Sequence, residues 1–250
     1  MAEHRAMPEY LSPRTCHRRR PWLVLCATLL LSTALSAVAQ QAQGFQDTMA
    51  QRMQACTACH GEQGRAAPDG YYPRLAGKPA AYLYNQLRHF RDGRRNYQLM
   101  TQLLAPLSDA YLLEIAEYFA ALELPYPAPA RVVASAQALQ RGEQLALRGD
   151  AARQLPACAS CHGAALTGML PATPSLLGLP RDYLNAQLGA WRNGQRKAHA
   201  PDCMAEIAQA LAPDDVAAVS AWLATRPVPV PARAVAASQV RPTLACGGGR

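Results

Sequence analysis

The chain has few aromatic residues, few charges and no run of alternating β-branched residues. Aromatic side chains make up 6% and charged side chains 17% of its 250 residues. Without such an alternating pattern, the sequence gives no support for a β-sheet protein. Glycine and proline are plentiful, and half of the residues are hydrophobic, which suffices for the cores of two small domains. We therefore expect an all-α protein with long loops.

The chain also lacks an apolar run of the roughly 20 residues that a membrane-spanning helix requires. The hydrophobic stretch Trp22–Leu35 is shorter, follows five arginines and precedes Ala37-Val38-Ala39. This arrangement predicts a cleavable signal peptide over residues 1–39, a mature chain that begins at Gln40, and export to the periplasm. The alternative, an uncleaved anchor, is disfavoured by the short run. We expect association with the membrane only through partner proteins.

The formal net charge of +8 would suit a nucleic-acid partner only if the positive residues stayed in the mature chain. Residues 1–39 contain five Arg and two Glu, so their removal lowers the net charge to +5. The sequence therefore gives no indication of nucleic-acid binding.

A repeat of roughly one hundred residues indicates a duplicated domain. Cys56-Thr57-Ala58-Cys59-His60-Gly61 recurs as Cys158-Ala159-Ser160-Cys161-His162-Gly163, and each unit continues with Pro-x-Leu, Tyr-Leu-x-x-Gln-Leu and aromatic-Arg-x-Gly segments. The repeat predicts a first domain over 40–124, a Pro-rich linker over 125–133, a second domain over 134–226 and a disordered tail over 227–250.

Helical periodicity recurs within each unit. In the first unit, Leu83, Leu87 and Phe90 fall on one face, and a second helix follows the N-cap candidate Ser108. The apolar positions of the other predicted helices are Leu112, Ile115 and Phe119, then Leu184, Leu188 and Trp191, and finally Val216, Val219 and Leu223. Four helices are thus expected, two in each unit.

The Cys-x-x-Cys-His motif is typical of covalent haem c attachment. Two cysteines three positions apart on a helical turn can form thioethers with the two vinyl groups of one porphyrin, and the histidine ligates the iron. A zinc site would need four ligands from paired motifs, but here each motif begins its own copy of a complete domain. A dithiol redox motif would sit in a βαβ context, which the sequence does not show. The motifs predict two haem c groups, attached at Cys56 and Cys59 and at Cys158 and Cys161, with His60 and His162 as iron ligands.

The sixth iron ligand is expected from later in each unit. Met100 lies 40 residues after His60, and Met204 lies 42 residues after His162, at matching places between the two helices of each unit. Thioether sulfur is a common axial ligand. A methionine that only fills an apolar gap is the alternative for both.

Other residues compete for these positions. His199 and Cys203 lie close to Met204, and a bis-histidine site would have a lower reduction potential. We expect His89 on the polar side of its helix, and Met169 is too near His162 to reach the opposite face of a haem. Cys203 and Cys246 remain after the motif cysteines are assigned, either as a disulfide or as free thiols.

These residues resemble the dihaem class I cytochromes c of the cytochrome c-4 type, over about residues 45–226. The resemblance implies two small α-helical haem domains, in which the carbonyl groups of Pro73 and Pro174 receive the Nδ1 protons of His60 and His162. It also implies electron transfer in the periplasm, often toward terminal oxidases. The segment 199–203 and the tail depart from the family pattern.

The leading hypothesis is an electron carrier without catalytic residues, because a haem closed by its own methionine has no position for a substrate. Its partners would be redox proteins such as a membrane oxidase, a reductase or a dehydrogenase. The alternative is a dihaem electron-transfer subunit of a periplasmic dehydrogenase complex. A haem peroxidase would require one iron to lose its sixth ligand.

Overall fold

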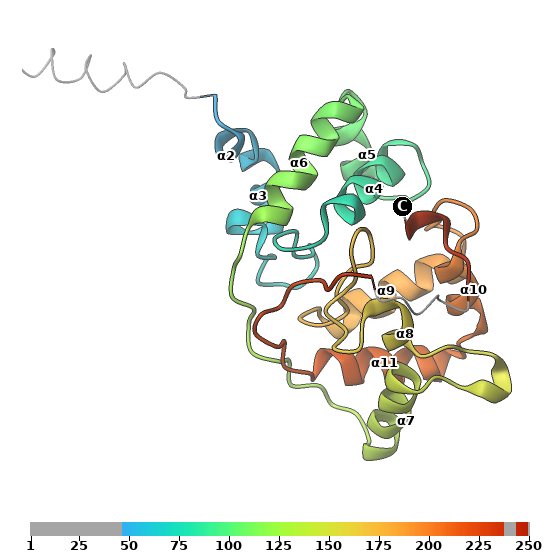
Figure 1. Ribbon diagram of the computed structural model, residues 1–250. Helices are drawn as coiled ribbons and strands as arrows, with labels where there is room; N and C mark the ends of the chain where they lie inside the picture. Colours follow the sequence, from blue (N-terminus) through green and yellow to red (C-terminus); the bar gives the residue numbers. More distant parts are fainter. Residues whose placement is uncertain (1–46, 238–243, 250) are drawn as a thin grey trace, which may run out of the picture. The chain divides into compact units, whose positions relative to one another are not determined.

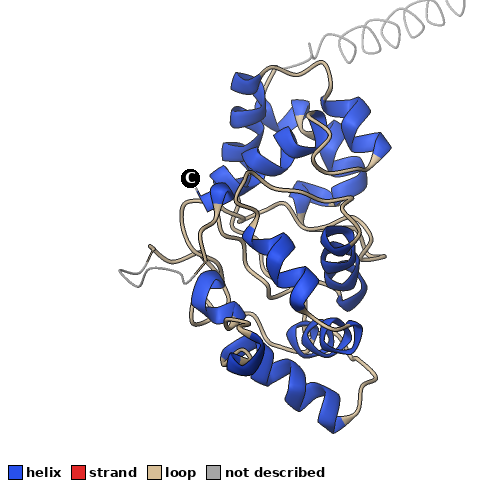
Figure 2. Cartoon of the chain, turned by 90° about the vertical axis from the view of Figure 1, so that its right-hand side faces the viewer, coloured by secondary structure: helices blue, strands red, loops and turns tan. Residues whose placement is uncertain are grey.

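The computed structural model describes residues 47–237 and 244–249, and these residues form helices and loops (Figures 1 and 2). Across those ranges the extended backbone makes isolated bridges but no strand. None of the helices described there is long and apolar enough to cross a membrane. The predicted signal peptide, residues 1–39, lies outside the described residues. The prediction of an all-α fold is confirmed.

The helices fall into two similar sets, which we call the first and second lobes. Both belong to one compact unit, Thr48–Arg250. The first lobe contains α2 (Met49–Arg52), α3 (Gln54–His60), α4 (Ala80–Arg91), α5 (Gln98–Leu104) and α6 (Asp109–Ala121). The second contains α7 (Ala136–Leu147), α8 (Cys158–His162), α9 (Arg181–Arg192), α10 (Cys203–Ala210) and α11 (Pro213–Ala224). Short 3₁₀ turns lie at Glu62–Gly64, Ala151–Arg153 and Gly247–Gly249.

The core of the first lobe lies between α4 and α6, as the apolar periodicity predicts. Leu83 packs there against the face of α6 that carries Leu112, Ile115 and Phe119. The hydroxyl of Ser108 accepts a hydrogen bond from the Tyr111 N–H and so caps α6. Because the cap satisfies one of the free N–H groups at the helix start, the helix begins where the sequence indicates.

The core of the second lobe is built on the contact between α7 and α11, which lie side by side in Figure 1. The sequence analysis did not identify α7. Gly142 lets the two helices approach closely, because a Cβ atom at this position would lie 2.2 Å from the Ala218 carbonyl oxygen. Val219 and Trp222 of α11 complete the core together with Leu145 of α7.

The segment between the lobes is fixed in place although it contains no helix. Arg74 donates hydrogen bonds to the carbonyl oxygens of Leu124 at 2.6 Å and Pro125 at 3.1 Å, and its guanidinium lies 4.0 Å from the ring centre of Tyr126. Farther along, the Ala130 N–H donates to the Ala224 carbonyl oxygen at 3.2 Å. The Pro-rich segment is therefore hydrogen-bonded near its start and again at Ala130.

The sequence predicts a disordered tail, and its described residues 227–237 and 244–249 make long-range bonds to the second lobe. Val235 pairs with the 168–170 loop through two backbone hydrogen bonds of 2.8 and 3.1 Å. The Gly247 N–H donates to the Pro201 carbonyl oxygen at 2.9 Å, and Cys246 forms a disulfide with Cys203. These long-range bonds order a segment whose composition alone indicates disorder.

Candidate haem-binding sites

Each motif histidine ends a short helix and is held by a proline carbonyl. His60 ends α3 and its Nδ1–H donates to the Pro73 carbonyl oxygen at 2.8 Å; His162 ends α8 and donates to that of Pro174 at the same distance. This bond fixes the tautomer and leaves Nε2 as the lone-pair nitrogen that can bind a metal. Both proline contacts that the family resemblance implies are present.

Burial keeps both imidazoles neutral. Each side chain is 7% exposed. Burial lowers the pKa of His60 despite the opposing effect of the Pro73 hydrogen bond, and the charge of Arg95 lowers it further. Burial likewise lowers the pKa of His162. A neutral imidazole is the form that ligates iron.

The motif cysteines lie three positions apart on one helical turn, and none of the four is in a disulfide. Burial raises the pKa of the Cys56 and Cys158 thiols to about 11. The surroundings of these sulfurs therefore disfavour a thiolate and suit a neutral group. A thioether to a porphyrin is such a group.

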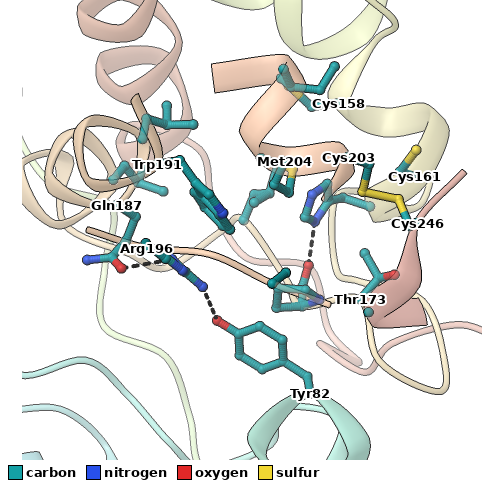
Figure 3. Close-up of a pocket in the computed structure, with 18 of the residues that line it drawn as sticks. Tyr82, Cys158, Cys161, Thr173, Gln187, Trp191, Arg196, Cys203, Met204 and Cys246 are labelled. Atoms are coloured by element: carbon teal, nitrogen blue, oxygen red, sulfur yellow. Dashed lines mark hydrogen bonds between the residues drawn. A yellow bond between two sulfur atoms is a disulfide. The ribbon is translucent and has the colours of Figure 1, made fainter. Parts of the chain in front are cut away.

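A cavity of about 220 Å³ in the second lobe brings the predicted site residues together. Cys158, Cys161 and His162 line it, and so does Met204 (Figure 3). Much of the remaining lining consists of aliphatic side chains, which include Leu145, Leu155, Leu184, Leu188, Ile207 and Val219. Two thiols, one imidazole and one thioether in an apolar cavity fit a covalently attached haem.

The two methionines lie on short helices that the sequence analysis did not identify. Met100 is in α5 and packs on the core of the first lobe, and Met204 is in α10. The Thr101 hydroxyl donates to the Phe90 carbonyl oxygen at 3.0 Å and so ties α5 to α4. Arg192 of α9 donates to the Ala208 carbonyl oxygen at 2.9 Å and ties α10 in the same way. Each methionine is therefore positioned by the helix that precedes it.

His89 is buried, so its predicted place on a polar helix face is wrong. It is 3% exposed and lies against His199, with 4.9 Å between the ring centroids. The face looks polar within one lobe, but packing of the other lobe covers it. His199 is not among the residues that line the cavity, whereas Met204 is. Of the two alternatives left open for Cys203 and Cys246, the structure contains the disulfide, directly beside Met204.

The family model described as Cytochrome c matches residues 46–108 and 140–227, one stretch in each lobe. This chain belongs to the cytochrome c family. Its relatives include a protein named thiosulfate dehydrogenase electron acceptor from Thiomonas intermedia (strain K12), 40% identical over 173 residues, or 69% of this cytochrome and 79% of the relative. Cytochrome c4 of Pseudomonas aeruginosa is 36% identical over 204 residues, which cover 80% of this cytochrome and 96% of the relative.

Solved structures agree with this assignment. Reduced cytochrome c4 from Pseudomonas stutzeri is similar with a TM-score of 0.61 and 30% identity, covering 70% of this cytochrome and 95% of that chain. Thiosulfate dehydrogenase (TsdBA) from Marichromatium purpuratum is similar with a TM-score of 0.60 and 35% identity over 69% of this cytochrome. The match spans only 36% of the length of that second structure.

This cytochrome therefore carries two covalently bound haem c groups, as the duplicated motif predicts. It is an electron carrier rather than a catalytic enzyme, and it works with redox partner proteins. The predictions of family, cofactor and general function are confirmed.

The sequence analysis missed the polar residues by which the lobes of the cytochrome contact each other. Arg95 donates to Gln187 Oε1 at 2.6 Å and to the Tyr183 hydroxyl at 3.4 Å. Arg196 donates to Gln86 Oε1 at 3.0 Å and to the Tyr82 hydroxyl at 3.4 Å. A signal for them was present, because the Tyr-x-x-x-Gln spacing recurs in both units and places two polar side chains on one helix face.

Proposed function

We propose that Cys56 and Cys59 hold the first haem through thioethers, and that His60 and Met100 ligate its iron. Cys158 and Cys161 would hold the second haem, with His162 and Met204 as ligands. The hydrogen bonds to Pro73 and Pro174 support the histidine assignments, and the place of Met204 in the lining of the second cavity supports its role.

When bound, haem supplies the one-electron oxidation and reduction of its iron. The protein residues would keep the iron ligands in the same positions when the iron changes its oxidation state. The Pro73 and Pro174 carbonyls fix the imidazole orientations, and the α4–α5 and α9–α10 hydrogen bonds fix the methionines. Aliphatic side chains make up much of the lining of the second site. Such preorganised surroundings suit electron transfer and leave no place for a substrate.

We further propose that this cytochrome accepts electrons from a thiosulfate-oxidising dehydrogenase in the periplasm and passes them to another redox protein. The observation that carries this proposal is the 40% identity to a thiosulfate dehydrogenase electron acceptor over 79% of that relative. A second such relative, from Stutzerimonas stutzeri (strain A1501), is 38% identical over 91% of its length. The cytochrome c4 relatives favour the alternative, a shuttle that serves other donors and an oxidase.

Ligation is tested by the sulfur-to-iron charge-transfer band of the oxidised protein. Met100→Ala and Met204→Ala should each remove about half of its intensity, because each deletes one of two equivalent sulfur ligands. His199→Ala is the matched control and should leave the band unchanged. A full band in Met204→Ala would reject Met204 as a ligand.

The partner is tested by mixing the oxidised cytochrome with a purified thiosulfate dehydrogenase and thiosulfate. Rapid reduction of both haems is expected, and omission of either the enzyme or thiosulfate should abolish it. If the haems stay oxidised while a small-molecule reductant reduces them fully, the dehydrogenase is not the donor and the shuttle alternative holds.

A further inference from the structure

Two buried cationic side chains lie where the first lobe meets the cavity of the second lobe. Lys78, from the first lobe, is 8% exposed, and Arg196, from the second lobe, is 5% exposed. Both line the cavity that contains Cys158, His162 and Met204. No carboxylate within residues 47–237 and 244–249 forms an ion pair with either of them.

The neighbours of these two cations are neutral. Arg196 donates to Gln187, Gln86 and Tyr82 at distances of 2.8 to 3.4 Å, and its guanidinium lies 3.7 Å from the ring centre of Trp191. The Lys78 ammonium lies 6.0 Å from the ring centre of Tyr82. Arg95 adds a third positive charge beside Arg196. Burial of unpaired charge costs free energy, so we expect an anion to bind at this cluster.

A further polar atom in the same lining has no partner. His89 Nε2 is buried and makes no hydrogen bond to any described group, and His89 lines the cavity next to Gln86. Buried polar atoms are nearly always hydrogen-bonded, so a group that enters the cavity is expected to reach this nitrogen. The cations and the unpartnered nitrogen thus mark one end of the cavity as an anion site.

The position of this end identifies the anion. Figure 3 shows Tyr82 and Arg196 away from Cys158, on the other side of the cavity. A haem attached at Cys158 and Cys161 through its vinyl groups directs its two propionate carboxylates to the opposite edge. We propose that Lys78, contributed by the first lobe, binds a propionate of the second haem together with Arg196. The proposal rests on the proposed function, because it takes Cys158, Cys161 and His162 as the attachment site.

The contribution of Lys78 makes the two haem sites unequal. The repeat aligns Gly77 with Gly178, so the counterpart of Lys78 in the second lobe is the apolar Leu179. The position of Arg95 in the first unit, in contrast, is also an arginine in the second unit, Arg196. A positive charge beside a haem disfavours the oxidised iron, which carries one more positive charge than the reduced iron. Lys78 therefore raises the reduction potential of the second haem.

Potentiometric titration of the haem-loaded protein tests this assignment. Lys78→Met should lower the potential of one haem, with its one-electron reduction constant falling about three- to tenfold, where tenfold corresponds to 59 mV. Lys78→Arg should retain most of the wild-type potential. Lys197→Met is the matched control, since it removes a lysine of the second lobe that is exposed. Lys78→Gln provides a second neutral variant if Lys78→Met does not assemble.

The shifted haem is identified in the Met204→Ala background, where the remaining charge-transfer band reports the first haem. In this background, Lys78→Met should leave the reduction potential of the first haem, measured at that band, nearly unchanged. A shift no larger than that of Lys197→Met, or an equal shift of both haems, overturns the proposal. A band that survives intact in Met204→Ala would instead contradict the proposed ligation, so the two failures are distinguishable.

Discussion

Arg95 and Arg196 lie side by side at the contact between the lobes, joined by an antiparallel backbone bridge, and each donates to the glutamine of the other lobe. Each also donates to the glutamine of its own lobe, Arg95 to Gln86 and Arg196 to Gln187. The same residue types from equivalent positions of the repeat thus meet around an approximate two-fold axis. Duplication of one domain supplied both halves of the contact.

Gln187→Leu should destabilise the contact between the lobes. It removes an acceptor that both arginines use and leaves the buried Arg196 with one less partner, so we expect a loss of about 1–3 kcal/mol in the free energy of unfolding. Urea denaturation measures the change. Gln144→Leu, on the exposed face of α7, is the control and should stay within about 0.5 kcal/mol of wild type. An equally small change in Gln187→Leu would show that the contact does not depend on these hydrogen bonds.

Removal of the Cys203–Cys246 disulfide should loosen the tail and the start of α10. The bond closes a separation of 43 residues, for which a loss of about 2–4 kcal/mol is expected in Cys203→Ser/Cys246→Ser. Limited proteolysis should then cut within residues 244–249, whereas the wild-type protein should resist until a dithiol reductant is added. Equal resistance of the double variant and the wild type would indicate that the Gly247 hydrogen bond and packing hold the tail without the disulfide.

Local patterns predicted the parts of the fold that local interactions determine. The helices α4, α6, α9 and α11 each bury the apolar positions that the periodicity marks, and Ser108 caps α6, so their positions follow from periodicity and capping. The sites of His60 and His162 are also predicted by local sequence, because each histidine ends a five-residue Cys-x-x-Cys-His motif. In contrast, α5 and α10 contain seven and eight residues, which is too short for a periodic pattern to stand out.

Long-range contacts determine what the sequence did not predict. His89 is buried, and Lys78 lines the second cavity, only because the other lobe packs there. The residue pattern within one domain does not predict packing between two domains. Cys246 of the tail forms a disulfide with Cys203. The sequence permits this disulfide but equally permits two free thiols. Interactions between distant segments are thus the information that the analysis of one sequence lacked.

The second lobe should lose stability in acid through Asp215. This carboxylate is 6% exposed and accepts hydrogen bonds from Arg141 at 2.8 Å and Arg153 at 2.6 Å. Burial alone would raise the pKa of Asp215, but the two arginines outweigh it and hold the pKa below its usual value. A depressed carboxyl pKa contributes stability above the unfolded-state pKa of about 3.9, and that stability is lost as pH falls toward the folded-state pKa.

Asp215→Asn should therefore cost about 1.5–3 kcal/mol at neutral pH, and the difference from wild type should shrink below about pH 4. Chemical denaturation at a series of pH values measures this trend. Asp214→Asn is the control, because Asp214 occupies the same first turn of α11 but is exposed. A difference that stays constant down to pH 2 would mean that the carboxylate charge is not the stabilising feature.

Gly142 and Gly189 provide a matched pair for the close packing of α7 on α11. Both are helical, but a Cβ at Gly142 would lie 2.2 Å from the Ala218 carbonyl oxygen and 2.8 Å from Trp222 Cβ, whereas a Cβ at Gly189 would meet nothing within 4 Å. Gly142→Ala must push the helices apart, and overpacking of this kind costs about 1–3 kcal/mol. Gly189→Ala should stabilise the protein by about 0.5–1 kcal/mol, because alanine favours the helix. Thermal denaturation should therefore shift in opposite directions for the two variants. A stabilising Gly142→Ala would show that α7 can move away from α11 at little cost, and that the second core tolerates a wider helix spacing.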